Sequence, residues 1–218
     1  MVVSFVTIKM NSTRLPGKNI LPLGGHPLVE RICDTLLACR RVDRICIYCS
    51  DEHIMDYVPR SQRIEFLQRP KWLDGDMVTM HDVYSSFISE VDADIYVAAL
   101  ATAPFITAET IDRGIEAITD FGYDSSLSVK RLQTYVWYDG HPVNFYPDNV
   151  LRTQDLKPAF IETCGFYAFR REVWQQKQSR VGTNPFFVEV LHQEAIDIDN
   201  RDDYDFARII AETNRKRP

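Results

Sequence analysis

The sequence predicts an α/β fold, in which a mostly parallel sheet carries helices on both faces and a β-rich insertion interrupts the order. Short apolar runs rich in β-branched residues alternate with segments whose apolar residues follow helical spacing, which is typical of a parallel sheet covered on both faces. Residues 125–166 depart from that order, because they are rich in Tyr, Trp, Gly and Pro and contain short alternating stretches that favour hairpins. After this insertion the strand and helix pattern returns.

The first half of the chain predicts strands and helices in alternation. The expected strands are Val2–Ile8, Arg44–Cys49, 64–67 and 94–100, and the expected helices are 26–40, 78–91 and 107–120. In the first helix Leu28, Ile32 and Leu36 recur at helical spacing. Thr107 can cap the third helix, and Glu109 lies near the positive end of its dipole.

The C-terminal part predicts one more strand and a final helix. We expect a strand near residues 195–198 and a helix from about residue 202 to residue 214. That helix is acidic at its start, with Asp202 and Asp203, and basic at its end over residues 215–217. This distribution of charge suits the helix dipole.

Size and composition fit one domain over residues 1–218. Of the 218 residues, 45% are hydrophobic and 26% are charged, as in an ordinary globular protein with a sizeable core. No apolar run approaches the ~20 residues of a membrane span, and no basic segment followed by a long apolar one opens the chain. The net charge of −6 disfavours nucleic-acid binding through bulk charge. We therefore expect neither membrane nor nucleic acid as a partner.

The cysteines favour a reduced, cytoplasmic protein. There are five of them, an odd number in a chain with no apparent secretion signal. Cys46 and Cys49 form a C-x-x-C motif, but they lie on a predicted strand, where residues three apart point to opposite faces. Their sulfur atoms then cannot share a metal ion, and we expect both to pack in the core.

The polar loop after the first strand is the first candidate site. In an open α/β sheet, ligands bind beyond the carboxyl ends of the strands. Residues 9–19 combine small hydrogen-bonding side chains, a Pro-Gly turn and the cations Lys9, Arg14 and Lys18. This composition fits a triphosphate cradle, although the P-loop spacing is absent. The alternative is a solvated basic turn.

The second candidate is the pair Asp197 and Asp199. If residues 195–198 extend as a strand, these two carboxylates project from one face. Two hard oxygen ligands suit Mg²⁺, which completes its shell with phosphate and water. The alternative is that Asp199 or Asn200 caps the final helix.

Several segments resemble the acylneuraminate cytidylyltransferases, which make CMP-activated sialic acids and related sugars. Residues 14–20, Arg-Leu-Pro-Gly-Lys-Asn-Ile, are similar to the signature of that family. The further similar segments are residues 49–52, 69–76, 101–105, 152–156, 162–167 and 196–199. They follow the family's order and cover nearly the whole chain, so that together they are more specific than any one of them.

The resemblance implies a Rossmann-like nucleotidyltransferase sheet and a Mg²⁺-dependent transfer of CMP from CTP to the hydroxyl of an acidic sugar, with release of pyrophosphate. The sugar would be a nonulosonic acid of sialic, legionaminic or pseudaminic type. Lys18, Arg14 and Lys9 would act on the triphosphate, and Asp197 and Asp199 would hold the Mg²⁺. The expected nucleotide-binding residues are Asn11, Ser12, Thr13, Asn19, Arg69 and Asp76. The expected acceptor-binding residues are Thr102, Arg152 and Gln154.

Three departures from the family pattern leave the acceptor open. Lys9 stands where the family has arginine, Arg14 stands where it has glycine, and Leu100 replaces a glutamine that helps hold the sugar in sialic acid enzymes. Either Lys9 or Arg14 could replace the family arginine; the second would match a related group linked to spore-coat polysaccharide. A cytidylyltransferase for 3-deoxy-octulosonate or a phosphonate, and a non-catalytic nucleotide-binding module, remain alternatives.

The insertion predicts an interface. Residues 132–160 carry several aromatic side chains, and the resemblance implies that this hairpin-rich region crosses to the partner in a homodimer. An exposed aromatic hairpin marks an interface more often than a nucleic-acid surface. The sequence leaves Lys130, Arg131 and Arg152 as equal candidates for the cation that meets the acceptor's carboxylate. His81 faces either the sugar or the surface of its helix.

Overall fold

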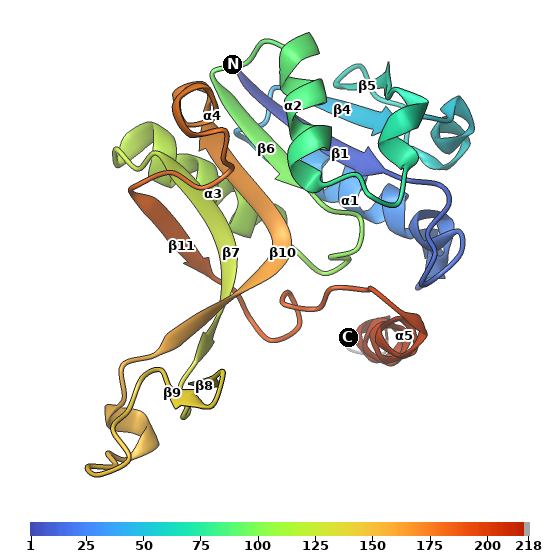
Figure 1. The fold of residues 1–218 in the computed structure, drawn as a ribbon. Helices are drawn as coiled ribbons and strands as arrows, with labels where there is room; N and C mark the ends of the chain where they lie inside the picture. The colour runs from blue at the N-terminus through green and yellow to red at the C-terminus, as the bar shows by residue number, and fades with distance from the viewer. Residues whose placement is uncertain (216–218) are drawn as a thin grey trace.

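The computed structural model describes residues 1–215 and contains a seven-stranded sheet of strand order β11-β7-β10-β6-β1-β4-β5 (Figure 1). The strands are β1 (Val2–Ile8), β4 (Arg44–Cys49), β5 (Ile64–Gln68), β6 (Ile95–Ala99), β7 (Ser125–Leu132), β10 (Ala159–Arg170) and β11 (Pro185–Glu189). Every neighbouring pair is parallel except the two that β10 makes, with β6 and with β7. The predicted mostly parallel sheet is confirmed.

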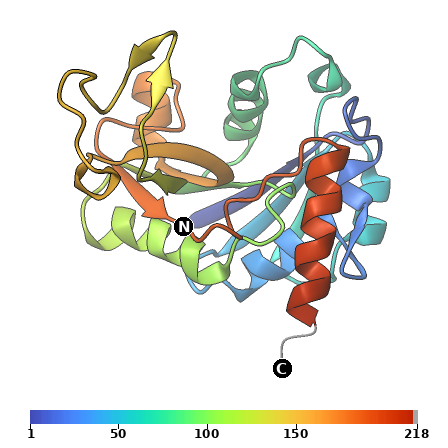
Figure 2. The ribbon, with the colours of Figure 1, turned by 90° about the horizontal axis from the view of Figure 1, so that it is seen from below.

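Helices cover both faces of the sheet (Figures 1 and 2). Helices α1 (Leu28–Ala38) and α3 (Ala108–Asp120) pack on one face, and α2 (Met80–Glu90) and α4 (Arg171–Lys177) pack on the other. The last helix, α5 (Arg201–Arg215), packs instead against the loop that follows β1 and the start of α1. None of the helices within residues 1–215 is long and apolar enough to cross a membrane.

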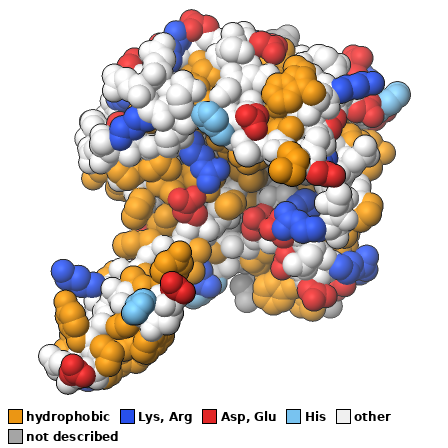
Figure 3. All heavy atoms as spheres, viewed as in Figure 1, with side chains coloured by type: hydrophobic (Ala, Val, Ile, Leu, Met, Phe, Trp, Pro, Cys, Tyr) orange, Lys and Arg blue, Asp and Glu red, His pale blue; other side chains and the backbone are white. Residues whose placement is uncertain are grey.

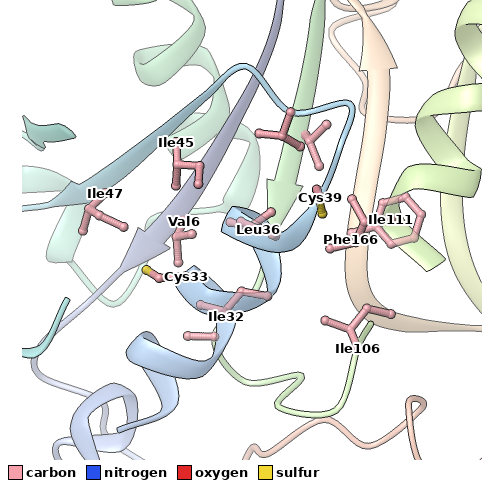
Figure 4. Close-up of a cluster of buried hydrophobic side chains, with 14 of the residues drawn as sticks. Val6, Ile32, Cys33, Leu36, Cys39, Ile45, Ile47, Ile106, Ile111 and Phe166 are labelled. Carbon is pink, nitrogen blue, oxygen red and sulfur yellow. The ribbon is translucent and has the colours of Figure 1, made fainter. Parts of the chain in front are cut away.

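Two hydrophobic clusters, one on each face, hold the layers together. On the α1 and α3 face, Val6 and Ile45 pack with Ile32 and Ile111 (Figure 4). The opposite cluster is rich in aromatic residues, where the rings of Phe5 and Phe87 stack with centroids 4.2 Å apart. Burying one such side chain contributes about 1.5–3 kcal/mol to the free energy of folding. These contacts fix the sheet that carries the loops at its carboxyl edge.

The two cysteines of the C-x-x-C motif lie on β4 and point to opposite faces of the sheet, as the alternation of side chains along a strand predicts. Cys46 belongs to the aromatic cluster, and Cys49 belongs to the cluster on the opposite face. The Sγ atom of Cys46 donates to Oε1 of Glu65 at 2.9 Å, and burial raises the pKa of its thiol. All five cysteines are free thiols. Core packing of this motif is confirmed.

An arm formed by residues 133–158 projects from the sheet between β7 and β10 (Figure 1). It contains the hairpin β8 (Trp137–Tyr138) and β9 (His141–Pro142) and the short helix η4 (Thr153–Asp155). The Asn144 side chain bonds backbone groups of Thr134, Val136 and Lys157, so that both sides of the arm are joined. The remaining short elements are η1 (Lys18–Ile20), β2 (Pro22–Leu23), β3 (His26–Pro27), η2 (Glu52–Tyr57) and η3 (Lys71–Asp74).

The predicted strand over residues 195–198 is wrong. Ile198 faces the cluster under α5, and the amide of Ile198 donates to the carbonyl oxygen of Thr102 at 2.8 Å, but no strand ladder forms along this segment. The last strand of the sheet is β11 instead. Neither β11 nor α4 was predicted, because these short elements follow the long insertion without a clear hydrophobic period.

The other helix boundaries differ by one or two residues. Residues 26–27 pair with β2 rather than opening α1, and α2 begins at Met80 because Thr79 and Asp82 form a capping box before it. The basic end expected for α5 includes Lys216 and Arg217, which lie outside the described residues.

Candidate active site at the carboxyl edge of the sheet

A cavity of about 420 Å³ opens where β1, β5 and β6 end. Predicted site residues that line it are Lys9, Ser12, Thr13, Arg14, Lys18, Asn19, Arg69, Asp76, Thr102, Asp197 and Asp199. Asn11 lines a smaller adjoining cavity together with Arg14 and Lys18. Arg152 and Gln154 are not brought to this cavity within the described chain, since both lie in the arm. We call the space the nucleotide cavity from here on, after the ligand that the sequence resemblance implies.

The loop after β1 folds around Lys18. Gly17 adopts a positive φ of 66°, which a residue without a side chain does at little cost, and η1 begins directly after it. The Asn19 side chain donates to the carbonyl of Lys9 at 3.1 Å and closes the loop. Lys18 is only 9% exposed, and its Nζ donates to the carbonyl of Ile198 at 2.7 Å. The ammonium is therefore held in one position.

Arg14 and Lys18 share one carboxylate, whereas Lys9 pairs with another. Nη2 of Arg14 and Nζ of Lys18 lie 2.9 Å and 3.3 Å from Oδ1 of Asp199. Nζ of Lys9 lies 3.1 Å from Oδ1 of Asp76, on the segment that precedes α2. The loop thus directs Arg14 and Lys18 toward the same point, with Lys9 paired elsewhere on the wall.

Asp197 and Asp199 lie in the cavity on an irregular segment rather than on a strand. The side chain of Asn200 accepts from the amide of Asp203 at 3.1 Å, and Oδ2 of Asp203 accepts from the amides of Asp199 and Asn200. Asn200 therefore caps α5, and the carboxylate of Asp199 is left for the cavity. The alternative of Asp199 as the cap is not what the structure contains.

The two carboxyl groups have pKa values displaced in opposite directions. Burial raises the pKa of Asp197, the nearby charge of Asp199 adds to the increase, and a hydrogen bond with Thr102 and the charge of Lys18 oppose it. Burial also acts on Asp199, but hydrogen bonds and charges of Arg14 and Lys18 bring its pKa below the ordinary value. The site therefore keeps Asp199 ionised, whereas too little positive charge lies near Asp197 to offset its burial.

The carboxylate pair fits a divalent cation. Oδ1 of Asp197 is buried and has no hydrogen-bond partner among the described residues, an arrangement that costs free energy unless another group compensates. Mg²⁺ binds through one or two carboxylates and takes its other ligands from phosphate and water. No group of three or more His, Cys, Asp or Glu within residues 1–215 could hold a metal. A cation here would thus depend on the substrate for further ligands.

Arg69 lies at the other end of the cavity, after β5. It is 3% exposed and forms an ion pair with Asp74, which also accepts from the hydroxyl of Ser50. The Nε atom of Arg69 is buried without a partner among the described residues. Asp74 was not predicted, although its place five residues after Arg69 in the 69–76 segment was the available signal.

Cys164 and Leu100 also line the cavity. Cys164 has a φ of 54°, uncommon for a residue with a side chain, and it lies in a β-bulge of β10 where the pairing with β7 shifts. The bulge therefore lies at the wall of the cavity, where Cys164 lines it. Cys164 belongs to the family-like segment 162–167, but no role was predicted for it.

Comparison with known proteins identifies the family. The family model described as "Cytidylyltransferase" matches residues 5–214, which is nearly the whole chain. The chain belongs to the cytidylyltransferase family. Among curated members it is 21% identical over 211 residues to the N-acylneuraminate cytidylyltransferase of Streptococcus agalactiae serotype V, covering 93% of this chain and 51% of that relative. The chain thus spans about half the length of this relative.

Two further similarities extend over nearly the whole length of both proteins compared. The pseudaminic acid cytidylyltransferase of Campylobacter jejuni (serotype O:2) is 22% identical, with 94% of both chains covered. The solved structure of CMP:2-keto-3-deoxy-manno-octonic acid synthetase complexed with CTP has a TM-score of 0.71 and 17% identity, covering 98% of this chain and 99% of that one. The second similarity establishes the fold of this family member.

Lys9 and Arg14 pair with different carboxylates, and this difference leads to a prediction about this member of the family. We expect Arg14→Ala to raise KM for CTP about tenfold, since a charge-assisted hydrogen bond contributes roughly 1.5–3 kcal/mol. Lys9→Ala should raise it less, because the ammonium of Lys9 is turned toward Asp76. Steady-state kinetics at saturating acceptor measure both. A larger effect for Lys9→Ala would mean that Lys9, not Arg14, replaces the family arginine.

Proposed function

We propose that this chain transfers CMP from CTP to a hydroxyl of an acidic sugar, a nonulosonic acid of sialic, legionaminic or pseudaminic type, and releases pyrophosphate. The observation that carries the proposal is the convergence of Arg14 and Lys18 on Asp199, beside the unpaired carboxylate oxygen of Asp197. The names of the N-acylneuraminate and pseudaminic acid relatives support an acidic sugar as the acceptor.

The cations would act on the triphosphate. Attack on the α-phosphorus builds negative charge on the non-bridging and leaving oxygens. Donors that are fixed before the reaction stabilise that charge without reorganising, and Lys18 is fixed by the carbonyl of Ile198. Arg14, which is more exposed, would neutralise the leaving pyrophosphate from the solvent side.

Asp197 and Asp199 would hold the Mg²⁺ that we propose as cofactor. When bound, Mg²⁺ neutralises phosphate oxygens and lowers the pKa of the hydroxyl that attacks. Asp197 would offer its unpaired Oδ1. Asp199 would bind the metal in place of Arg14 and Lys18, which would then contact the nucleotide. With the metal bound, a strong general base would be less needed in the chain.

At the other end of the cavity, Arg69 would contact the nucleoside part of CTP. Its guanidinium is anchored by Asp74, and its unpaired Nε is a donor without an acceptor. Asn11, Ser12, Thr13, Asn19 and Asp76 complete the proposed nucleotide contacts. Thr102, at the carboxyl end of β6 and next to Asp197, would contact the acceptor.

We further propose a homodimer in which the arm crosses to the partner. The arm is separated from the body and exposes apolar side chains (Figure 3), among them Tyr138, which is 79% exposed, and Trp137, which is 58% exposed. Arg152 and Gln154 lie far along this arm, and we propose that they meet the acceptor in the partner's site. The proposed compartment is the cytoplasm, in keeping with the free thiols.

The dimer predicts a mass of twice 25.3 kDa by light scattering coupled to gel filtration. Tyr138→Asp should shift the protein to the mass of one chain, because a charge in the core of an interface is left desolvated. Phe121→Asp is the matched control, an aromatic residue that is 70% exposed and lies outside the arm at the end of α3. A single-chain mass for the unmodified protein at all concentrations would contradict the dimer.

A different acceptor is the second candidate function. Leu100 lines the cavity where sialic acid enzymes of the resembled family have glutamine, which favours a sugar with another substituent pattern or 3-deoxy-octulosonate. An aminoalkylphosphonate and a non-catalytic nucleotide-binding module are the remaining alternatives.

The assay that separates these functions measures pyrophosphate release with each of the four nucleoside triphosphates and Mg²⁺. The acceptors are N-acetylneuraminate, pseudaminic acid, 3-deoxy-octulosonate and an aminoalkylphosphonate. We expect release with CTP and one nonulosonic acid. Release with 3-deoxy-octulosonate or the phosphonate alone would support the second candidate, and no release despite CTP binding would contradict an enzymatic function with these acceptors.

A further inference from the structure

A second cavity, of about 310 Å³, lies beside the nucleotide cavity and shares Met80 with it. Its walls come from the first turns of α2, from α4 and from the segment after α4; the other lining residues are His81, Tyr84, Trp174, Gln178, Ser179 and Arg180. The His81 ring stacks on Trp174 with centroids 5.3 Å apart. We call this space the Arg180 cavity, after the arginine among its lining residues.

The guanidinium of Arg180 is held in place by Tyr167 and Glu162, and the hydroxyl of Tyr84 also interacts with it. Its central carbon lies 3.7 Å from the centre of the Tyr167 ring, and its Nη2 lies 3.3 Å from Oε2 of Glu162. The hydroxyl of Tyr167 donates to the same oxygen at 2.7 Å, and burial together with that bond raises the pKa of Tyr167, so that it remains a neutral donor. A guanidinium has five N–H donors in a planar fork, and Glu162 engages one edge of it.

The contacts of Arg180 reach the nucleotide cavity. The Sγ atom of Cys164 lies 3.6 Å from the hydroxyl of Tyr167, and Cys164 lines the nucleotide cavity. Asp197 of the proposed metal site lines the same cavity, and its charge acts on the thiol of Cys164. Arg180, Glu162 and Tyr167 therefore form a polar chain that ends at Cys164, on the wall of the nucleotide cavity.

Arg180 suits an anion better than Arg131 and Arg152, two of the three cations that the sequence suggested. Its side chain is 32% exposed, so that solvent screens it less than an open surface charge. Arg152 is 75% exposed and paired with Asp155 in the arm, and Arg131 donates to Gln133 at the base of the arm. A partly buried, pre-oriented guanidinium binds a carboxylate through two parallel hydrogen bonds.

We propose that Arg180 binds the carboxylate of the acceptor sugar, with the stacked His81 and Trp174 as the apolar wall of the Arg180 cavity. This inference rests on the function proposed above and assigns its acceptor specificity to this residue. Glu162 and Tyr167 are positioning residues that hold the guanidinium. The acceptor class is thereby restricted to molecules whose carboxylate lies within a few bonds of the attacking hydroxyl, as in a 2-keto sugar acid.

The test compares N-acetylneuraminate, pseudaminic acid and 3-deoxy-octulosonate, each as the free acid and as its methyl ester, with CTP and Mg²⁺. The proteins are the unmodified chain, Arg180→Ala, Arg180→Lys and the control Arg113→Ala on α3. For the best acid, Arg180→Ala should raise KM about 30-fold with KM for CTP unchanged, as expected for a lost charge-assisted hydrogen bond. It should also abolish the preference for acid over ester. Arg180→Lys should lie between, because lysine keeps the charge without the fork.

Failure of the inference and failure of the proposed function give different results. If the unmodified protein turns over an acid and Arg180→Ala keeps both the KM and the acid preference, the assignment of Arg180 is overturned while the function stands. A parallel rise of KM for acceptor and CTP in Arg180→Ala would show a merely structural role and also overturn it. If the unmodified protein turns over none of the acids, the proposed function falls and the inference falls with it.

Discussion

Asp199→Asn should reduce kcat for pyrophosphate release by about 1,000-fold or more, since one positioned group that stabilises transition-state charge is worth ~10²–10³ in rate. The carboxylate is the common partner of Arg14 and Lys18 and one of the two proposed Mg²⁺ ligands. An amide keeps the shape but carries no charge, so both the metal and the orientation of the cations would suffer. Steady-state assays over a range of Mg²⁺ concentrations measure the effect.

Asp202→Asn is the matched control for Asp199→Asn. Asp202 lies in the first turn of α5 and is exposed, so its charge should leave kcat unchanged. Circular dichroism and thermal melting of both variants test the fold, which should persist because the cap of α5 is Asn200. Near-normal kcat for Asp199→Asn at low Mg²⁺ would remove Asp199 from the metal site.

Lys18→Met should lower kcat/KM for CTP by about 100- to 1,000-fold, corresponding to ~3 kcal/mol of transition-state stabilisation. The methionine retains most of the side-chain volume in a buried position but cannot donate to the carbonyl of Ile198 or approach phosphate as a cation. We expect the effect to appear mainly in kcat, because a fixed charge acts most where charge develops.

The control for Lys18→Met is Lys177→Met, at an exposed lysine on α4 that does not line the nucleotide cavity. It should leave both constants unchanged. If Lys18→Met lowers the melting temperature together with kcat/KM, Lys18 mainly anchors the segment before α5 through its bond to Ile198.

The sequence predicted the layers of the fold because they depend on local periodicity. Apolar runs such as Val2–Ile8 and helical spacing such as Leu28, Ile32 and Leu36 are properties of neighbouring residues, and the structure contains the corresponding β1 and α1. Residues 195–198, which were expected to extend as a strand, form no strand. Ile198 is buried because α5 and the loop after β1 cover it, and that contact is not visible in the segment itself.

The candidate site was predictable where it follows a strand and not where it depends on distant contacts. Arg14 and Lys18 belong to a loop that directly follows β1, so the rule for ligands in open sheets pointed to them. Arg180 is brought to Glu162 and Tyr167 by the packing of α4 and β10. Because α4 was not predicted from the sequence, Arg180 in the segment after α4 could not be assigned to the site.

The most direct test of the central claim is ³¹P NMR of the products formed from CTP and the active acceptor with Mg²⁺. Transfer of CMP predicts one new phosphodiester signal, which couples to no other phosphorus, and an equal amount of pyrophosphate. Inorganic phosphate with CDP, or a product carrying two coupled phosphorus atoms from CTP, would contradict attack at the α-phosphorus and with it the proposed reaction.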